Sequence, residues 1–240
     1  MIQYTNQSGV ALTSLVLAVE PNDWSSCFVL YSLLVNDQVP AWYSLIGNRL
    51  EVPLAAPLEP GASVVLVLQY TLALPLTSSS HVFGYNYLQA NLVDWYPFIV
   101  PYDPAAGWLL HQQGAVGEHL VYEAADFEVS LQLSDPSVVV AASAPNDLPG
   151  GYHYRLENAR NFVLSASPNY LVSTAVAGPV TVATYHFASE STGAAALLDH
   201  AVRAVNTFSS RFAPYPHLSL SVVEAIFPDG MEYDGLVFLN

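Results

Sequence analysis

Three carboxylates lie within six residues near the end of the chain, at Asp229, Glu232 and Asp234. They surround Gly230 in a turn that follows an apolar run with the pattern of a strand. A cluster of this kind could hold a cation, because ionised carboxylates form charge-assisted pairs. An isolated acidic turn is more commonly a solvated loop, so the surrounding sequence must decide between these interpretations.

Histidine is the second candidate for chemistry. The seven histidines are His81, His111, His119, His153, His186, His200 and His217. No two of them have the i, i+4 spacing of an H-E-x-x-H helix. His186 shares a predicted strand face with Val180 and Val182. We expect it to be a hydrogen-bonded core histidine or a half-exposed histidine instead of a metal ligand. The sequence therefore contains no complete metal site.

Nucleophilic and phosphate-binding motifs are also missing from the sequence. It has no G-x-S-x-G elbow, and its glycines never form G-x-G-x-x-G or a lysine-containing loop. Cys27 lies between Ser26 and Phe28 in apolar surroundings, which predicts a buried structural thiol. These absences exclude most general classes of enzyme.

Aromatic residues gather between residues 83 and 102, with Trp108 close behind. Tyrosine and tryptophan offer a flat apolar face with a polar tip, so Tyr85, Tyr87, Trp95 and Trp108 could form a platform for a sugar or a peptide. Packing at a corner between two sheets is the favoured alternative.

The charge of the chain excludes some partners. Five arginines, no lysine and twenty acidic residues give a formal net charge of −15, whereas nucleic acid and anionic membranes recruit Lys and Arg. Charged residues make up only 10% and hydrophobic residues 52% of the chain, which is the opposite of a disordered composition.

The hydrophobic sequence raises the possibility of a membrane protein. Its longest apolar stretch, residues 64–76, contains Gln69 and Pro75 and is shorter than the roughly 20 residues of a spanning helix. The first residues have neither the basic nor the apolar region of a signal peptide. Localisation stays open.

Strand and turn patterns dominate residues 3–189. Residues 126–134 alternate strictly between apolar and polar, which indicates a half-buried strand. Similar runs are predicted at residues 13–19, 27–35, 49–52, 63–72, 137–142, 152–156, 161–165 and 179–187. Many short strands at regular spacing favour a sandwich or stacked antiparallel sheets.

The period changes near residue 190. Leu198, Val202, Val205, Phe208 and Phe212 form one apolar stripe and predict a helix that ends at Arg211. Strand-like runs follow at residues 218–226 and 236–239. A segment of strand, helix, strand, turn and strand is too short to bury its own core, so we expect it to open a second domain whose remainder is missing.

Several stretches of this sequence resemble the aminopeptidase N family of zinc gluzincins. The most specific is the run of residues 215–225 followed by Gly230-Met231-Glu232-Tyr233-Asp234-Gly235-Leu236-Val237-Phe238, which is similar to the family's G-x-M-E-N exopeptidase motif. Residues 95–103, 125–129 and 159–168 resemble parts of the N-terminal β-domain in its bacterial branch. The matching stretches follow one another in order over most of the chain.

The resemblance implies a mainly β fold. Residues 1–187 would form a saddle-like antiparallel β-sandwich domain, and residues 188–240 would form the truncated start of an α+β, thermolysin-like catalytic domain. The full-length protein would bind zinc and remove N-terminal residues from peptides. The family's H-E-x-x-H helix and downstream glutamate would lie beyond Asn240, so no zinc is expected in this chain, which should be inactive alone.

The resemblance also implies roles for individual residues. Glu232 would bind the free α-amino group of the substrate, and Gly230 and Met231 would border the substrate backbone. Gln89 would match a polar residue that the β-domain sends into the amine-binding pocket, although a solvated strand glutamine is the favoured interpretation. Asp229 and Tyr233 depart from the motif, because the family has glycine and asparagine at these positions.

Three interpretations therefore remain. The chain is part of a zinc-dependent aminopeptidase, a non-catalytic β-domain scaffold related to the same family, or a carbohydrate-binding sandwich that uses the aromatic cluster.

Overall fold

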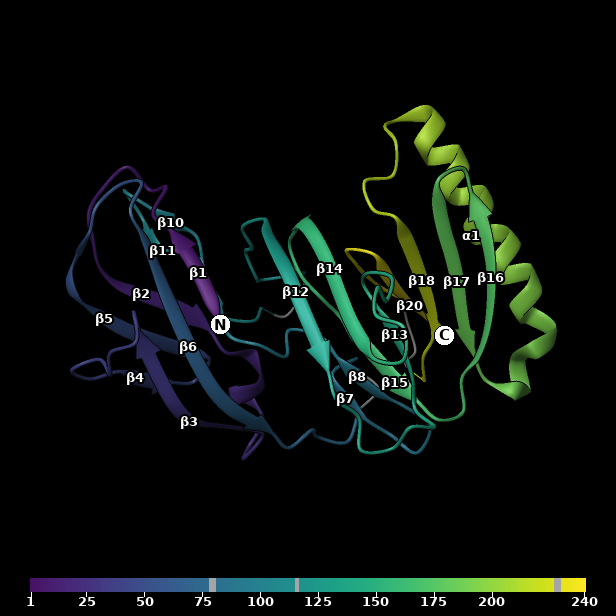
Figure 1. Cartoon of the computed structure of the whole chain (residues 1–240), viewed down its shortest axis with the longest axis horizontal. Helices are drawn as coiled ribbons and strands as arrows, with labels where there is room; N and C mark the ends of the chain where they lie inside the picture. Colours follow the sequence, from purple (N-terminus) through teal and green to yellow (C-terminus); the bar gives the residue numbers. More distant parts are fainter. Residues whose placement is uncertain (78–80, 115–116, 227–229) are drawn as a thin grey trace. The chain divides into compact units, whose positions relative to one another are not determined.

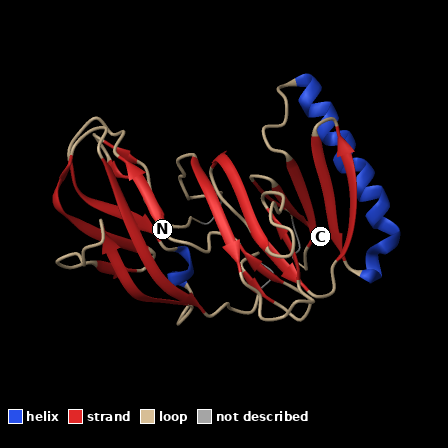
Figure 2. Ribbon diagram, viewed as in Figure 1, coloured by secondary structure: helices blue, strands red, loops and turns tan. Residues whose placement is uncertain are grey.

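The structure is a computed structural model, which describes residues 1–77, 81–114, 117–226 and 230–240. The predicted mainly β fold is confirmed: strands in several antiparallel sheets dominate, and a single long helix is present among these residues (Figure 2). The chain divides into two compact units, one of residues 1–75 and 94–123 and one of residues 76–93 and 124–240. The predicted domain boundary at residues 187/188 lies within the second unit and stays a prediction.

The first unit is built from two main sheets and a small hairpin (Figure 1). One sheet has the order β1-β6-β3, the other β4-β5-β2-β9, and β10 pairs with β11. The bounds are β1 Ile2–Thr5, β2 Leu12–Ala18, β3 Phe28–Val35, β4 Ser44–Ile46, β5 Arg49–Leu58, β6 Ser63–Leu72, β9 Phe98–Ile99, β10 Tyr102–Asp103 and β11 Gly107–Trp108, with a short 3-10 helix at Glu20–Asp23.

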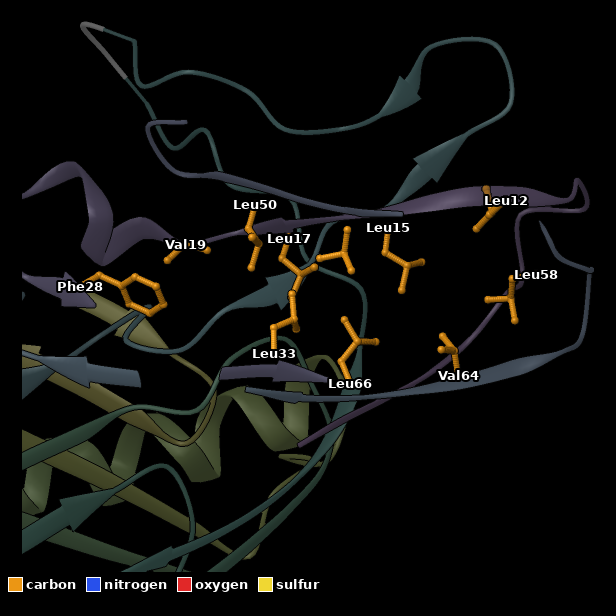
Figure 3. Packing of buried hydrophobic residues seen from close by; sticks show 11 residues of the cluster. Leu12, Leu15, Leu17, Val19, Phe28, Leu33, Leu50, Leu58, Val64 and Leu66 are labelled. Carbon is orange, nitrogen blue, oxygen red and sulfur yellow. The ribbon is translucent and has the colours of Figure 1, made fainter. Parts of the chain in front are cut away.

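Leucine and valine side chains from both sheets form the core of this unit. Leu15 and Leu17 of β2 and Leu50 of β5 are fully buried, and they pack in one cluster with Leu33 and Leu66 from the other sheet (Figure 3). Alternation along each strand sends these residues to one face, so the sequence pattern and the burial agree. Cys27 is a buried free thiol, as predicted.

A group of carboxylates with few cationic partners lies in the first unit. Burial raises the pKa of Asp94, although the Tyr122 hydroxyl donates a hydrogen bond of 2.6 Å to Oδ1 and partly opposes this shift. Burial also raises the pKa of Glu20, whose Oε2 lies 3.5 Å from Nε2 of His119. A carboxyl with a raised pKa destabilises the fold where it is ionised.

We expect Asp94→Asn to stabilise the protein at neutral pH. The folded-state pKa of Asp94 lies above its unfolded value, so the penalty is absent below the unfolded pKa and grows as pH rises through the folded pKa. The advantage of the variant should therefore shrink toward acidic pH in urea unfolding measured across this range. Asp135→Asn is the control of opposite sign, because hydrogen bonds from Ser137 lower the pKa of Asp135. A constant advantage at all pH values would contradict the assignment.

The second unit contains a mixed five-stranded sheet of order β16-β17-β18-β20-β19, and helix α1 packs on one of its faces. Further sheets have the orders β13-β15-β8-β7 and β12-β14. The bounds are β7 Gly84–Tyr85, β8 Ala90–Leu92, β12 Ala125–Leu131, β13 Val139–Ala142, β14 Tyr152–Ala159, β15 Leu164–Ser167, β16 Leu171–Ala177, β17 Val180–His186, α1 Ser191–Arg211, β18 Ser219–Glu224, β19 Met231–Tyr233 and β20 Leu236–Leu239, with a short 3-10 helix at Ala188–Glu190.

Helix α1 connects two parallel strands, β17 and β18. Its Leu198, Val202 and Val205 pack with Val180 and Val182 of β17, so part of the predicted apolar stripe faces the sheet. Phe208 and Phe212, farther along the stripe, remain 59% and 80% exposed. The predicted helix and the strands on either side of it are confirmed. Strand β19 is a further short strand, which follows β18 in the sequence and lies at the edge of the sheet beside β20.

Candidate functional site

The acidic segment identified in the sequence forms a hairpin at one edge of the mixed sheet. Strand β19 pairs antiparallel with β20, with Glu232 opposite Val237 and Met231 opposite Phe238. Gly235 occupies the turn with a φ of +73°, a conformation that glycine adopts at low cost. Asp229, the first residue of this segment, lies outside the described residues.

Glu232 is an exposed carboxylate on this edge strand. The strand registers place Thr184, Val222, Val237 and Glu232 in one row across the sheet. Thr184 is on the same face as Val182, which packs against α1, since residues two apart along a strand share a face. Glu232 therefore lies on the helix-bearing face, with its carboxylate open to a ligand.

An apolar groove of about 470 Å³ lies on the same face, between the C-terminal part of α1 and the sheet. Its lining includes Phe208, Phe212, Tyr215, Leu220 and Val237. Val237 is the cross-strand neighbour of Glu232. The edge of the sheet thus combines an anionic group with an apolar wall, which suits a ligand that carries both a cation and an apolar group.

Hydrogen bonds fix the turn of the hairpin. The Asp234 carboxylate accepts a bond of 2.6 Å from the backbone N–H of Arg160, and the Asp234 N–H donates to the side-chain oxygen of Asn161 at 3.1 Å. A β-carbon on Gly235 would lie only 1.8 Å from the carbonyl oxygen of Ser143. The hairpin is therefore positioned by close backbone packing within the second unit.

Gln89 is not the solvated strand residue that the sequence favoured, because its side chain is only 3% exposed. Its amide nitrogen donates to the Tyr170 hydroxyl at 2.6 Å and to the Glu224 carbonyl at 3.1 Å, while its amide oxygen accepts from the Ile226 N–H at 3.2 Å. Gln89 thus ties the start of β8 to the end of β18. The chain continues from there, through residues outside the description, to Gly230.

A buried polar network surrounds Gln89. Asn91, Ser165 and Tyr170 are at most 5% exposed, and the Ser165 hydroxyl donates to Asn91 at 2.6 Å and lies 2.7 Å from the Tyr170 hydroxyl. Burial raises the pKa of Tyr170 well above its usual value, so it stays a neutral hydroxyl. We did not anticipate this network, although two amides at positions 89 and 91 beside an apolar run were a signal for polar residues on one inward face.

The histidines of the second unit do not combine into a metal site. His186 is buried, as predicted for a core histidine. Its hydrogen bonding is less complete than predicted, since its Nδ1 has no hydrogen-bond partner among the described residues. Nε2 of His217 lies 3.6 Å from the Asp234 carboxylate. Within residues 1–77, 81–114, 117–226 and 230–240, no group of three or more His, Cys, Asp or Glu side chains could hold a metal ion.

The aromatic cluster is divided between the two units. Tyr85 and Tyr87 belong to the second unit and are 44% and 85% exposed. Trp108 belongs to the first unit, where its ring meets that of Tyr102 at a centroid distance of 5.0 Å and packs against the hydrophobic core. Packing therefore accounts for Trp108, whereas Tyr87 remains a surface residue.

The helices of the described part do not provide a membrane span, since none is long and apolar enough to cross a bilayer.

Comparisons with known proteins identify the fold. No family model matches the sequence, and neither does any curated protein. Solved structures do match. An M1 zinc metallopeptidase variant from Deinococcus radiodurans, bound to a Tyr-Ser-Ala substrate, superposes with a TM-score of 0.61 at 16% identity and covers 96% of this chain and 53% of its own.

Two further structures agree. The M1 zinc metallopeptidase from the same organism gives a TM-score of 0.59 at 16% identity, over 95% of this chain and 52% of that protein. A two-domain M1 zinc metallopeptidase variant bound to L-tryptophan gives a TM-score of 0.60 at 16% identity. This match covers 96% of this chain and 53% of that protein. This chain has the fold of M1 zinc metallopeptidases and spans about half the length of the ones it matches.

Proposed function

We propose that this chain forms the amino-terminal part of a zinc-dependent aminopeptidase that removes N-terminal residues from peptides. The observation that supports this most is the exposed carboxylate of Glu232 on the edge strand, within a Gly-Met-Glu sequence and a fold shared with M1 zinc metallopeptidases. One of those proteins was crystallised with a Tyr-Ser-Ala substrate. Residues 1–187 would be the β-domain and residues 188–240 the start of the catalytic domain.

Glu232 would bind the free α-amino group of the substrate. A carboxylate at a sheet edge can form a charge-assisted hydrogen bond with an ammonium group, which is about twice as strong as a neutral bond. Gly230 and Met231 would border the substrate backbone, because they precede Glu232 on the same edge. This arrangement would restrict the enzyme to the first residue of a peptide.

Gln89 would position this site, and its bonds to Glu224 and Ile226 hold the end of β18 from which the chain runs toward Gly230. Tyr233, at the position of the motif's asparagine, packs its ring against Phe238 at a centroid distance of 6.1 Å. Phe238 lies opposite Met231 and on the other face from Val237. Tyr233 also lines the apolar groove together with Val237, so it would border a ligand held by Glu232.

The described residues do not fit a zinc ion, since they contain no suitable group of ligands. We propose that the full-length protein binds zinc through residues that the 240 residues do not contain. Bound zinc would supply the activated water for peptide hydrolysis. The chain alone would bind part of the substrate and would not hydrolyse it.

The test uses a version of the protein extended past Asn240. We expect it to contain zinc and to cleave aminoacyl-anilides. Glu232→Gln should lower kcat/KM by about 10- to 100-fold, because a hydrogen bond to a charged group contributes about 1.5–3 kcal/mol, while zinc content stays unchanged. Glu157→Gln, at an exposed position on β14, is the matched control and should keep full activity.

Other outcomes would contradict the proposal. An extended protein with neither zinc nor turnover would support the non-catalytic scaffold instead. Equal activity of the Glu232→Gln variant would remove the amine-binding role. A preference for N-acetylated over free substrates would do the same, because an acetylated terminus carries no ammonium charge.

A further inference from the structure

The mixed sheet has two edges of different character. Strand β19 forms one edge, with three residues that include the charged Glu232. Strand β16 forms the other edge, with seven residues, Leu171–Ala177, that pair with β17 in an uninterrupted register. Among the described residues, no strand pairs with the outer side of β16, so its outward backbone groups remain available for pairing.

The β16 edge lacks the features that protect most sheet edges. Natural edge strands carry lysine, proline, inward charges or bulges that prevent pairing with another chain. Residues 161–189 contain no Asp, Glu, Lys or Arg, and β16 has no bulge. Strand β3 is also an uncharged edge, but a bulge between Leu30 and Ser32 interrupts its register.

The side chains of β16 are suited to a second strand. Val172, Thr174 and Val176 lie on the face away from α1, opposite Tyr185, Ala183 and Thr181 of β17. Val172 and Val176 are 45% and 71% exposed. β-Branched residues pair well across neighbouring strands. The valines of β16 could therefore pack against the side chains of a further strand added to this edge.

We propose that two copies of the chain associate through antiparallel pairing of their β16 strands. A two-fold axis at Thr174 brings each Val172 opposite the partner's Val176, and Ser173 opposite the partner's Ala175. Strand β16 is therefore self-complementary in this register, as a two-fold interface requires. The proposal does not depend on the proposed peptidase activity.

The distribution of charge favours association of two copies at the β16 edge instead of at other parts of the surface. The chain has a net charge of −15, so two copies repel each other over most of their surfaces. Strand β16 and its neighbour β17 add no charge to such a contact, since both lie within the uncharged residues 161–189. The pairing would join the two mixed sheets into one.

Helix packing is compatible with this pairing. Helix α1 covers β16 and β17 on one face, and neighbouring strands lie about 4.8 Å apart. The two-fold axis would place the two copies of α1 on the same face, about 10 Å apart across the seam, which is close to the spacing of packed helices. The dimer would thus bury helix surface as well as the strand edge.

The test is a charge exchange at the paired valines, measured by sedimentation velocity. The wild-type chain should have twice the mass of one copy at high protein concentration. The double variants V172E/V176E and V172K/V176K should each be monomeric, because each places like charges opposite one another. Mixing the two variants in equal amounts should restore the dimer through opposite charges.

A matched control separates edge pairing from docking on the sheet face. Thr181 lies opposite Val176 on β17 and is exposed. The Thr181→Glu variant adds a negative charge one strand farther from the edge, so it should leave the dimer intact. Thr174→Cys should form a disulfide-linked dimer, and Thr181→Cys should not. Circular dichroism of each variant verifies folding. A wild-type monomer at all concentrations, or a dimer that persists in V172E/V176E, would overturn the proposal.

Discussion

Gly235→Ala should destabilise the protein by about 4 kcal/mol or prevent it from folding. The added β-carbon would lie 1.8 Å from the Ser143 carbonyl oxygen and 2.8 Å from its carbon, and neither backbone atom can rotate away. The residue also has a φ of +73°, which costs a non-glycine residue roughly 1–2 kcal/mol. Overpacking adds about 1–3 kcal/mol more. Urea unfolding of the variant measures the sum.

Gly178→Ala is the matched control for this prediction. Gly178 also lies in a hairpin turn with positive φ, at +61°, but a β-carbon there would have no atom within 4 Å. It should therefore show only the conformational cost of about 1–2 kcal/mol. Equal losses in the two variants would mean that the contact with Ser143 does not fix the hairpin that carries Glu232.

Gln89→Leu should destabilise the protein by about 3 kcal/mol. Leucine fills a similar volume but leaves the Ile226 N–H and the Glu224 carbonyl without the partner that Gln89 provides. Each buried polar group that loses its partner costs about 1–3 kcal/mol. Thermal and urea unfolding would measure the loss, and in the extended enzyme the variant should also weaken peptide binding, because the end of β18 would no longer be held.

Gln132→Leu provides the comparison for Gln89→Leu. Gln132 is exposed just after β12, so the same substitution there should change stability by less than about 0.5 kcal/mol. Gln89→Glu gives a second test: an ionised carboxylate in this network should be more destabilising at neutral than at acidic pH, because burial penalises the charged form. A neutral effect of Gln89→Leu would show that the buried network does not stabilise the unit.

Local patterns in the sequence predicted the helix and most of the longer strands. Strict alternation indicated the half-buried strand that forms β12, and the helix predicted to end at Arg211 is α1. The apolar surroundings of Cys27 predicted its burial. These predictions succeed because side-chain periods of 2.0 and 3.6 residues follow directly from backbone geometry.

The sequence by itself determined the helix and most of the longer strands, and its Gly-Met-Glu segment directed attention to Glu232. It did not predict β16 or the short strands β1 and β4. Only the tertiary structure decided which residues meet. Gln89 was expected in solvent, yet it bonds to groups 135 and 137 residues away, and Asp234 accepts from a residue 74 positions earlier. No local pattern encodes such partners. A polar residue is buried only where the fold supplies its hydrogen bonds, and those arise from strands brought together by the burial of the apolar faces.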